Sequence, residues 1–251
     1  MDILFMGTGA ADWDITSRKD GDFFRRRTSV MINNDLLIDF NDETLDYIEK
    51  NECSLQNVEN ILITHTHDDH YSQKAVNKMF GENTEIRYNA GAKETIGSTN
   101  AVQSIIPMFT KTQVGRYSVI AIPANHSVAN AAEQPLHYII SDGEKTVFWG
   151  CDGAWLLNSS WHEIRKHKYD LVVFDGTLYD QEGDYRIFEH NNLHMITEMS
   201  ATFRNLKLMK EHSKIMISHM SKGAQYPHDE LVEYLKPFDI SPSYDGLKIE
   251  I

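Results

Sequence analysis

The chain of 251 residues has almost no cysteine, since Cys53 and Cys151 are its only two. Two cysteines exclude the disulfide framework of a small secreted protein, and they exclude a zinc site made of four cysteines. Disulfides belong to oxidising compartments, so their scarcity suits a reducing one. We therefore expect a cytoplasmic protein.

Long hydrophobic runs are missing as well. No apolar stretch approaches the roughly 20 residues that span a membrane, and the apolar run in Met1–Gly7 is too short for a signal peptide. No repeat, low-complexity tract or strong linker interrupts the chain. Because 41% of the residues are hydrophobic, which is enough for a full core, we expect a single domain over residues 1–251 and no membrane partner.

Basic residues are the third deficit. The 24 lysines and arginines stand against 37 aspartates and glutamates, which gives a formal net charge of −13. Proteins that bind nucleic acid without regard to its sequence generally present a dense cationic face to the phosphates. We therefore do not expect a nucleic-acid partner, whereas a small anionic substrate is possible where a bound metal supplies positive charge.

The pattern of apolar residues predicts a mixed α/β protein. Asn33-Asn34 and Asp142-Gly143 are typical of tight hairpin turns. The predicted strands are Ile3–Met6, Ser29–Ile32, Leu36–Phe40, Ile61–Thr64, Glu85–Tyr88, Tyr117–Ile122, Leu136–Ser141, Thr146–Trp149, Leu171–Phe174, Lys214–Ser218 and Leu247–Ile251. The predicted helices are Glu43–Lys50, Gln73–Phe80, Ser160–His167, Leu193–Lys210 and His228–Leu235. Two sheets flanked by helices would bury these strands.

What the sequence does contain is a dense cluster of metal-ligating residue types. The apolar run Ile61–Thr64 is followed by three histidines and two aspartates within six residues. Imidazole and carboxylate groups together suit Zn²⁺, Mn²⁺ or Fe²⁺. If the chain stays extended, His65 and His67 point the same way, because side chains in extended backbone repeat every two residues. A turn after Asp68 could then present Asp69 and His70 to a second ion.

Other residues of these types follow other predicted strands. His126, Asp152, Asp175 and His219 each come shortly after such a strand. Mixed α/β folds usually place a site at strand ends on a common rim, so we expect one convergent metal centre. Asp175 either orients a ligand histidine through its second ring nitrogen, as metal sites commonly require, or simply caps the end of its strand.

The order of these residues resembles the metallo-β-lactamase superfamily, whose signature is His-x-His-x-Asp-His, then a later His, a later Asp and a final His. The matching residues are His65, His67, Asp69, His70, His126, Asp152 and His219. The resemblance implies an α/β fold with four layers, the αββα sandwich, and a site for two divalent transition-metal ions, either zinc or manganese, with iron as a further possibility. The ligand sets that it implies are His65, His67 and His126 for one ion, Asp69, His70 and His219 for the other, and Asp152 with a hydroxide between them.

A narrower resemblance covers nearly the whole chain. It points to the branch that contains phosphoribosyl 1,2-cyclic phosphate phosphodiesterase, the PhnP-like proteins, whose relatives include tRNase Z. The segments that carry it are Phe5–Ala11, Arg26–Ser29, Leu36–Asp39, Asn125–Ser127, Val173–Asp175, His219–Ser221 and Tyr244–Gly246.

The branch often carries an auxiliary histidine before a long helix. His190 matches this pattern, with Asn192 as the helix N-cap, and His194 is the alternative. The resemblance thus implies that His190 acts in catalysis together with Asp69 and Asp152 at the metals.

Two departures from the branch concern metal and substrate. Many PhnP-like chains have a cysteine cluster after the Gly-Thr-Gly turn that holds a structural zinc, whereas Asp12-Trp13-Asp14 stand there in this chain. We therefore expect no third metal. Lys222 stands where some relatives have another histidine, and we consider it a candidate for substrate binding.

These features predict a binuclear metal-dependent hydrolase, a phosphodiesterase that acts on small or cyclic phosphodiesters. A thioesterase or lactonase would use the same metals on a carbonyl carbon. A tRNase Z-like endonuclease would want a basic exosite, which the net charge disfavours. A metal-binding module without catalysis would be expected to lose ligands, yet all seven are present. The resemblance also suggests a homodimer.

Overall fold

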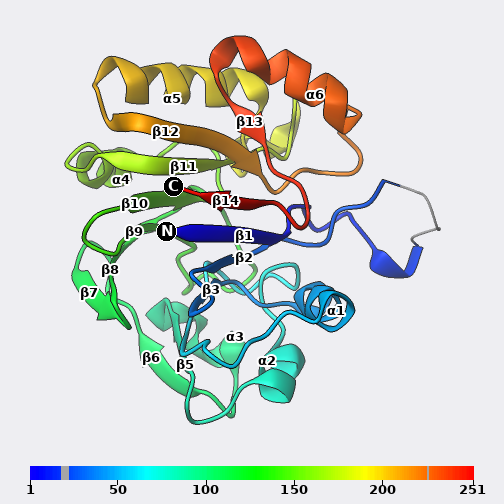
Figure 1. The fold of residues 1–251 in the computed structure, drawn as a ribbon, viewed down its shortest axis with the longest axis vertical. Coiled ribbons are helices and arrows are strands. Elements are labelled where there is room, and N and C mark those ends of the chain that lie inside the picture. Colours follow the sequence, from blue (N-terminus) through cyan, green and yellow to red (C-terminus); the bar gives the residue numbers. More distant parts are fainter. Residues whose placement is uncertain (18–22, 225) are drawn as a thin grey trace.

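A computed structural model describes residues 1–17, 23–224 and 226–251 of the protein. Its strands form two seven-stranded sheets that lie face to face (Figure 1). The first sheet has the order β14-β1-β2-β3-β4-β5-β6. Its strands are β1 (Asp2–Gly7), β2 (Ser29–Ile32), β3 (Leu36–Ile38), β4 (Asn60–Leu62), β5 (Glu85–Tyr88), β6 (Val102–Ile105) and β14 (Lys248–Glu250).

The second sheet has the order β13-β12-β11-β10-β9-β8-β7. Its strands are β7 (Lys111–Val114), β8 (Tyr117–Pro123), β9 (Leu136–Ser141), β10 (Thr146–Gly150), β11 (Tyr169–Asp175), β12 (Met209–Ser218) and β13 (Ser241–Pro242). Both sheets are mixed, because each combines antiparallel hairpins with neighbouring parallel strands.

Helices cover the outer face of each sheet (Figure 1). The first sheet is covered by α1 (Asp42–Asn51), α2 (Gln73–Met79) and α3 (Lys93–Ile96). The second sheet is covered by α4 (Asn158–Ile164), α5 (Leu193–Asn205) and α6 (His228–Leu235). The layers are therefore helix, sheet, sheet and helix, which confirms the predicted αββα fold. No helix in the described residues is long and apolar enough to cross a membrane.

The alternation of side chains along β1 shows how the layers are held together. Ile3 and Phe5 join the core between the two sheets, whereas Leu4 and Met6 join the core beneath α1 and α2. Successive residues of a strand point to opposite faces, so a strand covered on both faces is apolar throughout. Across the central core, the ring of Phe5 lies 6.2 Å from that of Trp149 in β10.

Parallel pairing brings several strand ends to one rim. β10, β11 and β12 are parallel neighbours in the second sheet, and β3 and β4 are parallel neighbours in the first. Parallel strands have their carboxyl ends on the same side, so the loops that follow them meet. The predicted ligand residues lie on these loops, except His126, which follows β8.

The two predicted hairpin turns are present. Asn33 and Asn34 both have positive φ angles, 48° and 61°, between the antiparallel strands β2 and β3. Asparagine tolerates this conformation better than most residues, which is why the pair is a turn signal. Gly143, with φ of 102°, stands between β9 and β10.

The prediction of one long helix over Leu193–Lys210 was wrong. The helix ends at Asn205, and Met209 already begins β12. Lys207, with φ of 56°, reverses the chain between them. The pairing of Tyr169 with Met209 provides tertiary contacts that local helix propensity does not reveal. Strands β6, β7 and β13 and the short helix α3 were also missed, and β6 is partly exposed along its length and has no clear apolar alternation.

Candidate metal centre

Three histidines form the first ligand group of the site. His65 and His67 follow β4, and His126 follows β8. The Nδ1 of His67 lies 3.0 Å from the Nε2 of His65 and 3.3 Å from the Nε2 of His126. Three imidazole nitrogens gathered in this way could together hold a metal ion.

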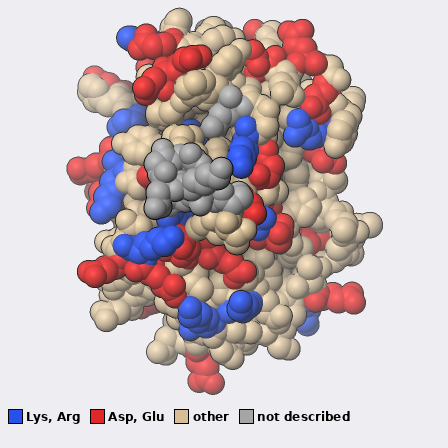
Figure 2. Space-filling view, turned by 90° about the vertical axis from the view of Figure 1, so that its right-hand side faces the viewer, with Lys and Arg blue, Asp and Glu red and all other residues tan. Residues whose placement is uncertain are grey.

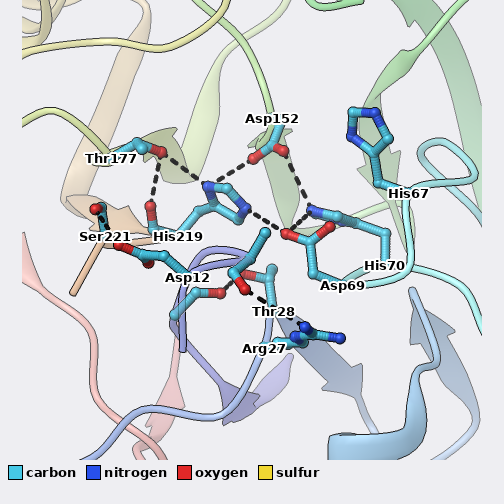
Figure 3. A network of polar contacts seen from close by, with 12 residues as sticks. Asp12, Arg27, Thr28, His67, Asp69, His70, Asp152, Thr177, His219 and Ser221 are labelled. Atoms are coloured by element: carbon cyan, nitrogen blue, oxygen red, sulfur yellow. Dashed lines mark hydrogen bonds and ion pairs between the residues drawn. The ribbon is translucent and has the colours of Figure 1, made fainter. Parts of the chain in front are cut away.

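Two aspartates and two histidines form the second ligand group (Figure 3). The Nε2 of His219 lies 3.2 Å from an oxygen of Asp69, and its Nδ1 lies 2.8 Å from Oδ1 of Asp152. The Nε2 of His70 lies 3.6 Å from Asp69 and 3.2 Å from Asp152. The ligand atoms of all four lie within 4.8 Å of one another, so this group could hold a second ion.

Asp152 faces both groups. Its Oδ2 lies 3.7 Å from the Nε2 of His65 and 3.7 Å from the Nε2 of His126. The same oxygen lies 3.2 Å from the Nε2 of His70. The carboxylate of Asp152 therefore lies between the two ligand groups.

The orientation of His70 shows that the residues present fit a metal ion. Its Nδ1 donates a hydrogen bond to Oδ2 of Asp39 at 2.7 Å, and Asp39 in turn accepts one from the hydroxyl of Thr64. The Nε2 of His70 is buried and forms no hydrogen bond. A ring that holds its proton on one nitrogen presents the other nitrogen as a metal ligand.

The two ligand groups differ in their electrostatics. Burial holds the pKa of His65 well below its ordinary value, which favours the neutral ring. Burial acts in the same direction on His70 and His219, but neighbouring carboxylates outweigh it, chiefly Asp69 for His70 and Asp152 for His219. They hold the pKa of His70 well above its ordinary value and raise the pKa of His219 to about 10. The second group thus attracts positive charge, which a divalent cation would supply.

A cleft of about 330 Å³ opens beside the metal centre. His190 lines this cleft, with its ring centre 5.0 Å from that of His126 and 5.6 Å from that of His219. The Nδ1 of His190 donates a hydrogen bond to Asp175 at 2.8 Å and lies 3.2 Å from the hydroxyl of Thr177. His190 therefore lies beside both ligand groups, with its Nδ1 already engaged.

The structure distinguishes between the two candidate auxiliary histidines. Asn192 caps α5 by accepting a hydrogen bond from the main-chain nitrogen of Met195 at 2.9 Å, as predicted. His190 precedes this cap and lies in the cleft, whereas His194 is exposed in the first turn of the helix and does not line the cleft. The geometry favours His190 for the auxiliary role.

Asp175 caps the end of its strand, and the histidine that it holds is His190, which is not among the predicted metal ligands. It accepts the hydrogen bond from His190, and its other oxygen accepts one from the main-chain nitrogen of Thr177, just beyond the strand. Its distance to the Nδ1 of His219, a predicted metal ligand, is 3.7 Å. Asp175 thus orients the predicted auxiliary histidine more directly than a predicted ligand.

Lys222 does not lie with the other predicted site residues. It is exposed and does not line the cleft, although its neighbour Ser221 does. Its Nζ lies 5.8 Å from the ring centre of Trp13, and its main-chain nitrogen donates to Asp12 at 2.9 Å. The structure thus gives no support to the prediction that Lys222 binds substrate.

Several residues that orient the ligands were not predicted. Asp39 accepts a hydrogen bond from the Nδ1 of His70, and the hydroxyl of Thr177 lies 2.8 Å from the Nδ1 of His219. Asp39 follows β3 in the structure, but the predicted strand Leu36–Phe40 included it, so the strand-end signal did not identify it.

Main-chain oxygens also contact histidines at the site. That of Glu189 lies 3.1 Å from the Nδ1 of His126, and that of Asp152 lies 2.6 Å from the Nε2 of His137. These contacts, like that of Thr177, depend on the meeting of distant loops and leave no local pattern.

The fold and this arrangement of histidines and aspartates define a protein of the metallo-β-lactamase class. The family described as the β-lactamase superfamily domain matches residues 43–220. This match covers more than half of the chain, so the protein belongs to that family. None of the curated proteins compared matches the sequence significantly.

Similar solved structures share the fold at low sequence identity. The metallo-β-lactamase fold protein YhfI from Bacillus subtilis is 14% identical with a TM-score of 0.74, over 100% of this chain and 99% of its own. The Zn²⁺-bound PqqB from Methylobacterium extorquens is 14% identical with a TM-score of 0.76, over 100% of both chains. Human tRNase Z, short form, is 16% identical with a TM-score of 0.69, over 100% of this chain and 99% of its own.

Proposed function

We propose that the protein is a hydrolase that uses two divalent metal ions, zinc or manganese in the first place, to cleave small phosphodiesters. The observation that carries this proposal is the position of Asp152 between two ligand groups. A site of this kind suits a reaction in which an attacking and a leaving oxygen must both be stabilised, as in phosphodiester hydrolysis. The sequence resemblance to phosphodiesterases supports this reaction type.

Two sets of residues would hold the two ions. One ion would bind to His65, His67 and His126, and the other to Asp69, His70 and His219, with Asp152 shared between them. Bound there, the ions would lower the pKa of a water molecule toward neutrality and offset charge on the phosphoryl oxygens. Asp39 and Glu189 keep His70 and His126 in the orientation that binding requires.

His190 would act on the leaving group. Its Nδ1 is engaged by Asp175 and lies close to Thr177, so its Nε2 is the nitrogen left for substrate. From the wall of the cleft it would donate a proton or a hydrogen bond to the leaving oxygen. Asp175 would keep the ring in place and stabilise its positive charge.

A small substrate agrees with the charge of the molecule. On the face drawn in Figure 2, lysine and arginine side chains are mixed with aspartate and glutamate side chains and do not gather into one basic surface. With a net charge of −13, the chain is poorly suited to long RNA. The tRNase Z-like alternative is therefore less favoured, although human tRNase Z shares the fold.

We also propose a cytoplasmic location. Cys53 and Cys151 are both free thiols, and Cys151 is buried. Neither residue takes part in a covalent link that would need an oxidising compartment.

Steady-state assays on metal-loaded protein test the reaction type. We expect bis(p-nitrophenyl) phosphate or a cyclic phosphodiester to be cleaved with a higher kcat/KM than a thioester, a lactone or a lactam. Faster cleavage of a thioester or lactone would assign the metals to carbonyl chemistry instead. Faster cleavage of a precursor tRNA than of any small diester would overturn the proposed substrate class.

A further inference from the structure

The cleft beside the metal centre is poor in positive side chains. Among the described residues that line it there is one arginine, Arg186, and no lysine. Outside the predicted metal ligands, three carboxylates line the same cleft, those of Asp12, Asp68 and Glu189. An anionic substrate that approaches the metals would pass these carboxylates, so a cation in the wall would help to draw it in.

The three carboxylates already have partners within the protein. Asp12 accepts hydrogen bonds from the loop at residues 221–223, with distances of 2.6 to 2.9 Å. Asp68 pairs with Arg27 at 3.0 Å, and Glu189 accepts a hydrogen bond from a serine hydroxyl. None of them pairs with the guanidinium of Arg186 within the described part of the chain.

Arg186 lines the cleft, and Asp184 holds only one edge of its guanidinium. Asp184 accepts hydrogen bonds from Nε at 3.0 Å and from Nη2 at 2.7 Å. Among the described residues, Nη1 has no hydrogen-bond acceptor, and the side chain is 33% exposed. A guanidinium fixed along one edge leaves donors on the other that match the oxygens of a phosphate group.

Main-chain hydrogen bonds join the turn that carries Arg186 to a predicted metal ligand. The main-chain oxygen of Arg186 accepts hydrogen bonds from the nitrogens of Glu189 and His190, both at 2.8 Å. The main-chain oxygen of Glu189 in turn lies 3.1 Å from the Nδ1 of His126. The cation, the auxiliary histidine and a predicted metal ligand are therefore joined through one short turn.

We infer that Arg186 binds the negatively charged phosphoryl group of the substrate, and that it gives the site a preference for anionic phosphate esters over uncharged ones. This inference rests on the proposed function, because it assumes that an ester reaches the metals through this cleft. Asp184 is the positioning residue that orients Arg186. The cation for substrate binding is then Arg186 and not Lys222, which lies outside the cleft.

The test is calorimetric binding of dimethyl phosphate to metal-loaded protein, which does not depend on turnover. The variants are Arg186→Gln, which removes the charge, and Arg186→Lys, which keeps it. The matched control is Arg165→Ala, because Arg165 is exposed at the end of α4 and does not line the cleft. Because hydrogen bonds to charged groups are comparatively strong, we expect Arg186→Gln to weaken binding roughly 10- to 100-fold. Arg186→Lys should recover part of the loss, and Arg165→Ala should match the wild type.

Metal content and thermal stability are measured for each variant, so that a damaged site is recognised. If Arg186→Gln retains two metals and binds dimethyl phosphate within twofold of the wild type, the inference is wrong. It is also wrong if the wild type does not bind dimethyl phosphate, or if the lysine and glutamine variants are equally impaired. Whether the wild type cleaves diesters is measured separately, so failure of the proposed function and failure of this inference are distinguishable.

Discussion

Asp39 and His70 form a buried pair in which a carboxylate oxygen accepts a hydrogen bond from the ring Nδ1 at 2.7 Å. The pair joins the end of β3 to the turn after β4, two parallel neighbours of the first sheet. Because this contact leaves the Nε2 of His70 directed at Asp69 and Asp152, it prepares a ligand for the second group. The orientation of His70 therefore depends on a residue outside the predicted ligand set.

Replacing Asp39 tests this dependence. Removing a residue that hydrogen-bonds to a metal ligand typically changes metal affinity by about 10- to 100-fold. Asp39→Asn should therefore weaken the binding of one of the two ions by that order. Competition with a coloured chelator measures both affinities. Asp142→Asn, in the hairpin turn between β9 and β10, is the control and should retain wild-type affinities. Equal affinities in Asp39→Asn and the wild type would show that Asp39 does not orient a ligand.

The ligand assignment predicts different losses for different substitutions. His126→Ala should chiefly weaken the binding of the ion at the first group. His219→Ala should chiefly weaken the binding of the ion at the second group. Asp152→Ala should weaken both, because its carboxylate faces both groups. Elemental analysis after dialysis would give the metal content of each variant. If Asp152→Ala retains as much metal as the wild type, its carboxylate is not shared.

His190 should affect the transition state and not metal retention. General acid catalysis contributes about 10²- to 10⁴-fold, so His190→Ala should lower kcat by that order with a poor leaving group while the metal content stays unchanged. The loss should shrink with p-nitrophenol as leaving group, because an acidic phenol needs little protonation. His194→Ala is the matched control. A near-normal His190→Ala with a crippled His194→Ala would transfer the role to His194.

Asp170 allows a test of the fold that is independent of the metals. Burial raises the pKa of Asp170, but hydrogen bonds from Lys210 and from the main chain of Thr146 outweigh it and lower the pKa below the ordinary 3.8. A lowered pKa means that the carboxylate stabilises the fold above about pH 3.8, and that this contribution is lost as the pH falls through the lowered pKa.

In metal-free protein at pH 7, Asp170→Asn should therefore lower the free energy of unfolding. Tm should fall by about 2–4 °C for each kcal/mol by which this free energy falls. The difference from the wild type should shrink as the pH falls below 3.8. Differential scanning calorimetry at several pH values measures it, with the exposed Asp2→Asn as control. A difference that does not change with pH would mean that the charge of Asp170 is not responsible.

The sequence was most informative where chemistry and strand periodicity coincide. The run from His65 to His70 follows an apolar strand, and the structure gathers its three histidines and Asp69 with His126, Asp152 and His219. The β-lactamase superfamily is confirmed by the family match, while the narrower phosphodiesterase branch stays a prediction. Contacts such as Thr177 with His219 join residues 42 positions apart, so they follow from the packing of loops and not from a local pattern. The end of α5 was misjudged for a related reason, because pairing with β11 fixes Met209 as a strand residue.

The measurement that tests the central claim most directly is a metal titration of the metal-free protein with hydrolysis of a small phosphodiester followed in the same sample. Zn²⁺ and Mn²⁺ are added separately, and Asp152→Ala is titrated in parallel. If the protein is a binuclear phosphodiesterase, diester cleavage should rise with added metal and level off at two equivalents per chain, and Asp152→Ala should show little activity at the same metal content. A chain that takes up no metal, or that takes up two ions and still leaves every small phosphodiester intact, would contradict the account.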